Sequence, residues 1–289
     1  MVLDYALRRA IEEHKDLGFT LTPRRSRRHP AVKLSDLDFA DDIGLLSDQI
    51  QQAQELLTKV ELQCQKVGLH LNAKKTEYMA LNIGDHVPLK TTDGTPLEQK
   101  PDFKYLGSWV NDSSTDIATR KAKAWTALHN MKKIWTSALS RKLKLRYFTA
   151  TVESILLYGC ESWSLTSATS KSLDGCYTRM LRMALQVSWR EHQTNEELYA
   201  GMPLLSTKMR ERRLGLAGHC YRHQDLPASK LLLWQPTHGK LGRGRPKTTF
   251  VDTLKADTGA TSTGELASCM EDRARWRDRF RTRPTGRRK

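Results

Sequence analysis

The sequence lacks the features that mark secreted and membrane-spanning proteins. Asp4, Arg8 and Arg9 interrupt the first ten residues, so the N-terminus does not resemble a secretory signal. No uninterrupted apolar run approaches the roughly 18 residues that a membrane-spanning helix needs. The five cysteines are odd in number and form no C-x-x-C pair, which favours a reduced compartment over a disulfide framework. We therefore predict an intracellular protein, nuclear or cytoplasmic, that is neither secreted nor held in a membrane.

Negative charge is also scarce. The chain has 32 acidic residues against 48 Lys and Arg, which gives a formal net charge of +16. The excess is clustered, because residues 271–289 hold nine Lys or Arg against three acids. Such a charge favours polyanionic partners, with nucleic acid as the first candidate, although a basic chain can also simply be soluble. The length of 289 residues allows one or two domains with a sizeable core.

Two adjacent carboxylates, Asp41 and Asp42, lie between two short apolar runs. The apolar residues on the two sides share one alternation parity: Leu37, Phe39, Ile43 and Leu45. This pattern is typical of a tight antiparallel β-hairpin with acids at its tip. Aspartate is also a common turn former, so an ordinary turn is the alternative that the pair alone leaves open.

A pair of neighbouring carboxylates suits a divalent cation. Two carboxylates forced together repel each other, and each disfavours ionisation of the other. Hard oxygen ligands of this kind suit Mg²⁺, which also takes substrate phosphates. Gly44, just past the tip, would let another backbone approach closely. The sequence therefore marks Asp41 and Asp42 as candidate Mg²⁺ ligands.

A helix and two strands are expected after the hairpin. Apolar residues at helical spacing predict a helix that starts near Ser47 and ends at Gly68, a residue suited to a C-terminal cap. Lys74 and Lys75 then lie in a turn before a predicted strand at 76–81. A second strand is predicted at 103–110, with Gly107 at a bend.

The second half of the chain predicts helices. A largely apolar seam runs from Ile117 to Trp135, and further amphipathic helices are predicted near 141–158 and 170–187, which together would form a bundle. Residues 235–289 mix Gly, Pro, Thr and Arg, and we expect them to be partly irregular. Within them, 243–246 matches the four-residue core of an AT-hook, where general nucleic-acid contact is favoured over true minor-groove reading.

Several blocks, taken in order, resemble a known family. They are Phe39-Ala40-Asp41-Asp42, then residues 68–77, then Phe103-Lys104-Tyr105-Leu106-Gly107, and downstream residues 212–219, 242–247 and 272–276. Their order and spacing resemble those of a reverse transcriptase of the non-LTR retrotransposon group (LINE-like, RTE-like). The first three blocks are similar to the aspartate-pair motif, the fourth palm motif and the primer-grip motif of that family.

The resemblance implies a set of roles. Asp41 and Asp42 would be catalytic ligands of Mg²⁺, two ions being held in the intact family, and Lys75 would face the incoming triphosphate. The implied partners are an RNA template, a DNA primer and deoxynucleoside triphosphates. Primer and nucleic-acid contacts would come from Phe39, Phe103, Lys104, Tyr105, Leu106, Gly107, Arg120, Lys123, Lys132, Lys133, Arg243 and Arg245.

The chain also departs from the family pattern. The family takes further metal-binding carboxylates from an earlier strand and shapes its nucleotide pocket with a fingers region, and neither is recognisable here. We therefore expect the C-terminal part of a longer protein that does not polymerise by itself. Two alternatives stay open: a non-catalytic basic nucleic-acid-binding protein derived from a retroelement, and a decayed copy.

The expected fold class is α+β. A partial polymerase palm, an antiparallel hairpin sheet plus helices, would be followed by a helical thumb and a basic, partly irregular C-terminal region. By residue number, the expected regions are a partial palm at 1–82, a primer-grip-like strand region at 83–115, a thumb-like bundle at 116–200 and the basic region at 201–289. The oligomeric state is not indicated by any of these patterns.

Overall fold

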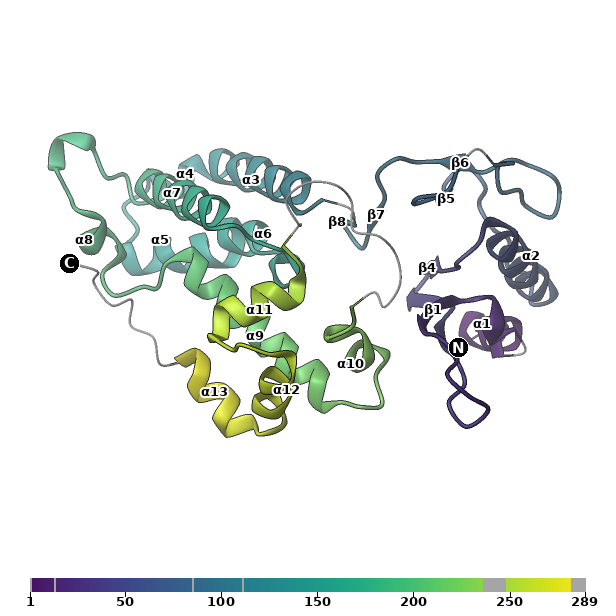
Figure 1. Cartoon of the computed structure of the whole chain (residues 1–289). Helices are drawn as coiled ribbons and strands as arrows, with labels where there is room; N and C mark the ends of the chain where they lie inside the picture. Colours follow the sequence, from purple (N-terminus) through teal and green to yellow (C-terminus); the bar gives the residue numbers. More distant parts are fainter. Residues whose placement is uncertain (1, 13, 85, 111, 236–247, 282–289) are drawn as a thin grey trace. The chain divides into compact units, whose positions relative to one another are not determined.

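The computed structural model describes residues 2–12, 14–84, 86–110, 112–235 and 248–281. These residues form two compact units that divide near residue 112 (Figure 1). Helices and small sheets together give an α+β protein, as the sequence predicts. Among the described residues, no helix has the length and apolar character needed to cross a membrane.

The first unit combines two helices with small sheets. Helices α1 (Val2–Glu12) and α2 (Ile50–Lys66) pack on each other through buried residues that include Leu7, Leu56 and Val60. Each sheet has two strands among the described residues, and only the β5–β6 pair is parallel. The strands are β1 (Phe19–Thr22), β2 (Val32–Leu34), β3 (Asp36–Phe39), β4 (Asp42–Leu45), β5 (Glu77–Tyr78), β6 (Glu98–Gln99), β7 (Lys104–Tyr105) and β8 (Ser108–Trp109). A short 3₁₀ turn, η1 (Lys15–Leu17), precedes β1.

Helix α2 confirms its predicted end but not its predicted start. Gly68 has a φ of 76°, the left-handed conformation expected just after a helix. The N-cap is Gln49, because the hydroxyl of Ser47 instead donates to the carbonyl of Leu17 at 2.8 Å. The strand predicted at 76–81 is confined to Glu77–Tyr78, where it pairs with β6.

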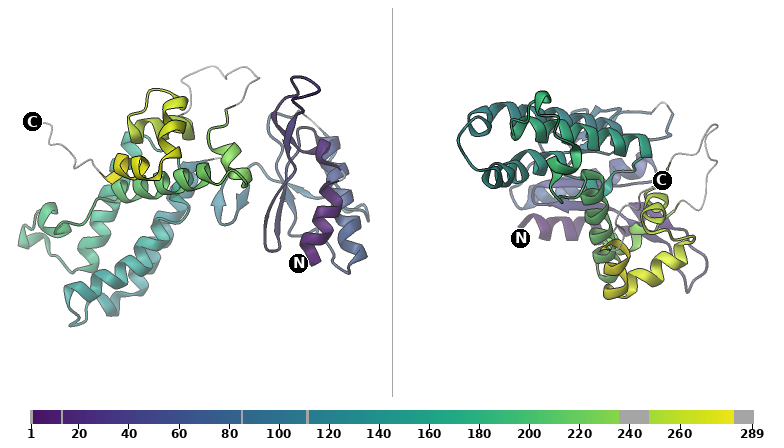
Figure 2. Two further views of the ribbon diagram at one scale, coloured as in Figure 1. Left: turned by 90° about the horizontal axis from the view of Figure 1, so that it is seen from below. Right: turned by 90° about the vertical axis from the view of Figure 1, so that its left-hand side faces the viewer.

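The second unit is helical throughout its described part (Figures 1 and 2). Its first half contains α3 (Ser113–Asn130), α4 (Lys132–Trp135), α5 (Arg141–Phe148), a π-helical turn η2 (Thr149–Glu153), α6 (Ser154–Leu156), α7 (Ser167–Ala184) and α8 (Asn195–Tyr199), with 3₁₀ turns η3 (Cys160–Ser162) and η4 (Trp189–Glu191). Its second half contains α9 (Leu205–Arg222), α10 (Pro227–Leu232), α11 (Phe250–Thr258), α12 (Thr263–Glu271) and α13 (Arg273–Arg281).

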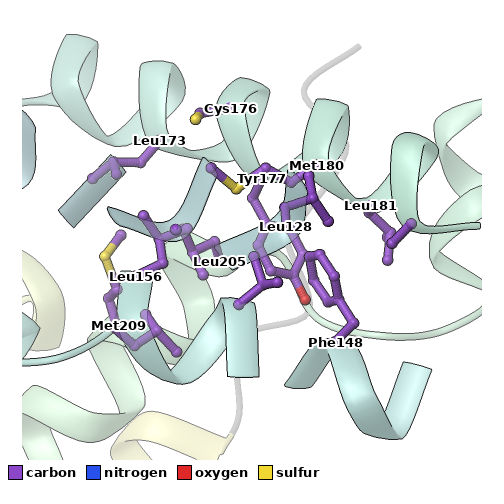
Figure 3. Close-up of a cluster of buried hydrophobic side chains, with 14 of the residues drawn as sticks. Leu128, Phe148, Leu156, Leu173, Cys176, Tyr177, Met180, Leu181, Leu205 and Met209 are labelled. Atoms are coloured by element: carbon purple, nitrogen blue, oxygen red, sulfur yellow. The ribbon is translucent and has the colours of Figure 1, made fainter. Parts of the chain in front are cut away.

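The predicted bundle helices are confirmed. Side chains from α3, α5, α6, α7 and α9 meet in one interior, where Leu128, Phe148 and Leu173 are essentially inaccessible to solvent (Figure 3). The helix predicted near 141–158 is α5, the π-helical turn and α6 in succession. The apolar and aromatic seams are therefore core, which agrees with their helical spacing.

The end of the described chain is more regular than predicted. Helices α11, α12 and α13, yellow in Figure 2, gather beside α9 and enclose a second apolar cluster. Trp276 is 2% exposed, and its indole N–H donates to the carbonyl of Leu214 at 2.7 Å. A Cβ on Gly218 would lie 2.4 Å from the indole nitrogen, so the ring fits because that position is glycine. The high Arg content of residues 235–289 concealed this apolar periodicity.

Candidate active site

Strands β3 and β4 form the predicted antiparallel hairpin. Phe39 is opposite Asp42, so the connection is a two-residue turn of Ala40 and Asp41. Ala40 has a φ of 57°, a conformation that tight hairpin turns require and that a residue without β-branching tolerates. Asp41 therefore lies at the tip, and Asp42 is the first residue of the returning strand β4 (Figure 1). Both side chains are exposed.

The two faces of this hairpin differ from the parity that the sequence suggested. Directly opposed residues share a face, so Phe39 and Leu37 lie with Asp42 and Gly44. Ile43 and Leu45 lie on the other face, where they pack against the α1–α2 core. The tight turn shifts the alternation between the two strands. It leaves Phe39 64% exposed beside Asp42, on the face that does not contact the helices.

A second acid pair occupies the helix-facing side of β3, and sequence reasoning missed it. Burial raises the pKa of Asp38 to about 6, helped by the charge of neighbouring Asp36, by a hydrogen bond with it and by the charge of Asp4. Burial also raises the pKa of Asp36, opposed by its hydrogen bond with Asp38. The Asp-x-Asp spacing in a strand was the available signal, because it puts both carboxyl groups on one face.

Asp41 and Asp42 are suited to supply part of the ligand set of a metal ion. Asp41 and Asp42 offer hard carboxylate oxygens at adjacent positions, the donor type that Mg²⁺ prefers. Within the ranges that the structure describes, no group of three or more His, Cys, Asp or Glu side chains is arranged to hold a metal ion. These two residues fit the role of metal ligands and leave further positions to water and substrate phosphates.

The predicted primer-grip segment is a second hairpin rather than one bent strand. Strands β7 and β8 pair with Lys104 opposite Trp109, and the turn consists of Leu106 and Gly107 with φ values of 48° and 82°. Two successive positive φ angles define the turn that best fits the twist of paired strands. Gly107 therefore reverses the chain, which corrects the single strand predicted at 103–110.

Tyr105 joins this second hairpin to the acid hairpin. Its hydroxyl donates a 2.9 Å hydrogen bond to the carbonyl of Leu37. A Cβ on Gly44 would lie 3.6 Å from the tyrosine ring, so the close approach predicted at this glycine is made by a side chain. Burial raises the pKa of Tyr105, and the charges of Asp38 and Asp42 add to the shift. The structure thus brings the predicted Tyr105 and Asp42 into one neighbourhood.

Comparison with known proteins shows which family part of the chain resembles. Residues 17–110, which include both hairpins, match the model of the family described as reverse transcriptase (RNA-dependent DNA polymerase). The chain is 27% identical over 263 residues to a transposon-derived protein of Caenorhabditis elegans, an alignment that covers 84% of this chain and 94% of that protein. It is 25% identical over 297 residues to a retrovirus-related Pol polyprotein from the type-1 retrotransposable element R2 of Popillia japonica. The chain is related to the reverse transcriptases of non-LTR retrotransposons.

The extent of these similarities differs between the relatives. The alignment with the R2 polyprotein covers 98% of this chain but 44% of the polyprotein. No solved structure matches the chain. The reverse transcriptase match spans residues 17–110, so it covers most of the first unit without α1 and leaves the helices of the second unit outside it.

Lys75, the residue expected to face the triphosphate of a reverse transcriptase, lies in an exposed turn. The backbone N–H of Lys75 donates to the carbonyl of Asn72 at 2.9 Å, which closes the turn after α2. Among the described residues, no hydrogen bond or ion pair joins its ammonium group to another side chain. The structure therefore leaves this lysine available to a ligand and does not join it to Asp41 or Asp42.

The nucleic-acid contacts predicted on the helices after residue 115 divide into two groups. Arg120 is only 6% exposed, and its guanidinium stacks over the ring of Tyr158 at 4.1 Å with Asp116 3.6 Å away. Because a buried guanidinium cannot reach a phosphate on a duplex, the prediction for Arg120 is corrected. Lys123, Lys132 and Lys133 are exposed.

Four other predicted contact residues have separate outcomes. Lys104 is exposed, with its ammonium group 6.0 Å from the centre of the Trp109 ring. Phe103 is half-buried, and its carbonyl accepts a 2.9 Å hydrogen bond from the N–H of Val110 at the open end of the β7–β8 hairpin. Arg243 and Arg245 lie outside the described residues.

Proposed function

We propose that this chain supplies the catalytic aspartate hairpin and the downstream region of an RNA-directed DNA polymerase from a non-LTR retrotransposon. The observation that supports it best is the exposed Asp41–Asp42 turn of the β3–β4 hairpin, inside the residues that match the reverse transcriptase family. In this proposal residues 1–82 are a partial palm, 83–115 the primer-grip region, 116–200 the thumb and 201–289 a basic nucleic-acid-binding region.

The parent reaction is template-directed nucleotidyl transfer. The 3′-hydroxyl of a DNA primer attacks the α-phosphate of a deoxynucleoside triphosphate paired with an RNA template, and pyrophosphate leaves. Asp41 and Asp42 are the residues that would hold Mg²⁺. When bound, the metal lowers the pKa of the attacking hydroxyl and stabilises charge on the phosphate oxygens. The larger share of this role falls to Asp41, which lies at the tip of the turn.

Residues beside the acids would position the primer. Phe39 shares a face with Asp42 and presents an exposed ring next to it, which suits contact with the terminal sugar or base of a primer. Tyr105 fixes the second hairpin to the first through Leu37, so the primer-grip segment and the acid turn would keep a constant separation. Lys75 would neutralise charge on the leaving pyrophosphate.

Exposed lysines support contact with the nucleic-acid backbone. Lys123, Lys132 and Lys133 lie on α3 and α4 with exposed side chains. Ammonium groups of this kind contact phosphates without reading sequence, and each phosphate neutralised adds about 0.9 to the slope of log affinity against log salt for duplex DNA. The bundle would therefore hold a template–primer duplex by charge rather than by base recognition.

Metal binding at the acid turn tests the proposal. Mn²⁺, a paramagnetic substitute for Mg²⁺, should broaden the NMR signals of the β3–β4 turn in the full chain. Asp41→Asn and Asp42→Asn should each remove most of that broadening, whereas Glu55→Gln, which deletes an exposed carboxylate on α2, should not. Equal broadening at the turn in all three variants would contradict the assignment of Asp41 and Asp42.

Primer extension tests activity separately. With an RNA template, a DNA primer, Mg²⁺ and nucleotides, we expect no extension by this chain alone, because the partial metal shell described above would lose most of the positioning that catalysis needs. Extension that disappears in Asp41→Asn would overturn the expected inactivity and support the catalytic role.

The second candidate function is a non-catalytic nucleic-acid-binding protein derived from a retroelement. The exposed basic residues of α3 and α4, and the net charge of +16, favour it as much as they favour the first. It predicts duplex binding in EDTA that falls steeply with salt and is unchanged by Asp41→Asn. Binding that requires both a divalent cation and Asp41 would exclude this alternative.

A further inference from the structure

Helix α5 lies in a part of the second unit that carries charge of one sign only. Residues 117–152 contain nine Lys or Arg and no Asp or Glu. Four of these cations belong to the eight residues of α5: Arg141, Lys142, Lys144 and Arg146. The contacts proposed above use lysines of α3 and α4, and α5 has no part in them. A helix with this charge is suited to a polyanion.

The cations of α5 are not neutralised by carboxylates of the protein. No ion pair found among the described residues involves any of the four, and all but the half-buried Lys144 are exposed. The guanidinium of Arg141 donates to the carbonyl oxygen of Leu198, which orders the side chain without cancelling its charge. Glu153, the first acid after α5, is buried and accepts a 2.7 Å hydrogen bond from the ammonium group of Lys208. The positive charge of α5 is therefore available to a ligand.

An exposed aromatic ring accompanies this charge. Tyr147 is 45% exposed, and Leu143, four residues earlier and hence on the same side of the helix, is 38% exposed. The contacts of α5 with the interior come from the fully buried Phe148 and from Leu145, which packs partly against the same cluster. The ring of Tyr147 therefore lies on the solvent side of the helix, next to the cations, and is not needed to fill the core.

An open hollow runs along α5 and onto the π-helical turn that follows it. It has a volume of about 690 Å³ and is lined by three cations and three uncharged residues: Arg141, Lys142, Leu145, Arg146, Thr149 and Ala150. π-Helical turns are rare and are found often at functional positions. Cations and apolar groups side by side suit a ligand that has both charged and apolar parts, as a nucleic-acid strand has in its phosphates and bases.

We propose that α5 binds an unpaired nucleic-acid strand, with Lys142 and Arg146 on its phosphates and the ring of Tyr147 stacked on a base. Cations hold phosphates without reading sequence, and an aromatic ring accepts any base because every base has a π-face. A duplex could use the cations but not the ring, since its bases are already stacked on one another. The inference rests on the nucleic-acid role proposed for this unit, and it adds a contact to bases that the lysines of α3 and α4 do not provide.

Affinity for a labelled oligouridylate, an RNA that does not pair with itself, tests the role of the ring. Measured by fluorescence anisotropy on the full chain, Tyr147→Leu should bind this RNA about tenfold more weakly, because leucine keeps an apolar side chain but loses the stacking surface. Tyr147→Phe keeps the ring and should stay within about twofold of the original chain. Tyr5→Leu removes a similarly exposed tyrosine from helix α1 in the other unit, and it should bind the RNA normally.

Salt dependence separates the ring from the cations. Lys142→Gln combined with Arg146→Gln should lower the slope of log affinity against log salt by about 1.4, since each phosphate of a single strand contributes about 0.7. Tyr147→Leu should weaken binding at every salt concentration and leave the slope unchanged, because it removes no charge. A general loss of structure would change the slope and the affinity together, and circular dichroism would reveal it.

An RNA–DNA duplex distinguishes failure of this inference from failure of the proposed function. The original chain and Tyr147→Leu should bind the duplex equally, because the cations remain in both. If the original chain binds the duplex but Tyr147→Leu binds oligouridylate as tightly as the original chain does, the inference is overturned and the proposed function stands. Binding of neither ligand by the original chain would overturn both.

Two further ligands identify the partner. Oligodeoxyuridylate lacks the 2′-hydroxyl groups, so weaker binding than that of oligouridylate supports an RNA strand, and equal binding supports an unpaired strand of either kind. A basic helix with exposed apolar side chains also suits an anionic lipid surface, which vesicles of phosphatidylcholine and phosphatidylserine test. Vesicle binding by the original chain, together with unchanged RNA affinity in Tyr147→Leu, would assign α5 to a membrane surface and overturn the inference.

Discussion

The two units of the molecule are built on different scales. In the first unit the buried clusters consist of aliphatic side chains with Cys64 and one aromatic ring, Tyr78, beside two-stranded sheets. In the second unit Trp135, Trp163 and Trp276 are fully enclosed, together with several other aromatic and aliphatic side chains. The helical unit therefore buries larger side chains in its core than the first unit does.

This difference shows where the candidate chemistry lies. An isolated two-stranded ribbon is marginally stable in water, so the β3–β4 hairpin depends on what packs against it. On one face Ile43 and Leu45 contact the helices, and on the other Tyr105 provides a hydrogen bond to Leu37. Because locally weak elements open at lower free energy than packed cores, we expect the acid turn to open more readily than the core of the second unit.

Removal of a core tryptophan from the second unit should have the largest effect. Trp135 is fully buried, and its indole N–H donates to the carbonyl of Leu128 at 2.7 Å. Trp135→Ala deletes this bond and leaves a cavity, so the free energy of unfolding of the second unit should fall by about 3–5 kcal/mol. Urea titration followed by tryptophan fluorescence measures the change, because every tryptophan except Trp109 lies in that unit.

If the two units unfold independently, Trp135→Ala should leave the stability of the first unit unchanged. Hydrogen exchange of the α1–α2 amides should be unchanged in Trp135→Ala, and Trp125→Ala, at a half-buried position, should cost less. Equal destabilisation of both units by Trp135→Ala would show that they unfold together, and the contrast between them would not hold.

Loss of Asp116 should have the next largest effect. This carboxylate is 1% exposed, accepts from the indole N–H of Trp163 at 2.8 Å and neighbours the guanidinium of Arg120. Asp116→Ala leaves a buried cation without its counter-charge, at a cost of about 3 kcal/mol or more. Lys123→Ala, about two turns along the same helix but exposed, should change stability by less than about 0.5 kcal/mol.

Denaturant titration of the two variants tests whether the buried Arg120–Asp116 pair stabilises the fold. A cost for Asp116→Ala no larger than that for Lys123→Ala would mean that the Arg120–Asp116 pair contributes nothing to the fold. The ion pair with Asp116 would then not be what holds the Arg120 guanidinium in the interior.

Helical periodicity was the most informative part of the sequence. The spacing of Leu173, Met180 and Ala184 predicted α7, and each of these side chains is buried. The alternation around Asp41 and Asp42 predicted a hairpin with both acids at its end, as found. These patterns are local, since residues a few positions apart must share a face whatever surrounds them.

Other features depend on neighbours that are distant in sequence. Arginine is usually a surface residue, but the guanidinium of Arg120 is buried, where it contacts Asp116 and Tyr158. The faces of the acid hairpin follow from the length of its turn, which shifts side-chain parity on the returning strand and which composition does not specify. Trp276 finds its place against Gly218, 58 positions earlier, so no local pattern could predict that core.

Loss of the hydrogen bond that links the two hairpins should have a smaller effect on stability. Tyr105→Phe removes the hydrogen bond to Leu37 but keeps the ring over Gly44, so the first unit should lose about 1 kcal/mol. Amides of β3 and β4 should exchange faster, while those of the second unit stay unchanged. Tyr5→Phe removes an exposed hydroxyl that bonds Arg9 in the same unit and should have no measurable effect. Equal exchange in both variants would show that Tyr105 does not hold the hairpin.

The smallest expected effect is a pH dependence confined to the first unit, because Asp38 is exposed and solvent screens its interactions. The pKa of Asp38 rises from 3.8 to about 6 because burial and Asp36 disfavour its charged form. Between these values the folded state binds a proton that the unfolded state has released. The stability that protonation of Asp38 adds to the folded state is therefore fully present below about pH 4 and is lost as the pH rises through about 6.

Two variants give this pH dependence opposite signs. Asp38→Asn should remove the loss, so its midpoint of unfolding should gain on that of the original chain as the pH rises from 4 to 6.5. Asp93 is the matched contrast, because hydrogen bonds from Thr91 and Thr95 lower its pKa and its contribution is lost as the pH falls. Asp93→Asn should therefore approach the original chain towards acid. If Asp38→Asn instead follows the original chain at every pH, burial and the charge of Asp36 do not raise the pKa of Asp38 in the folded chain.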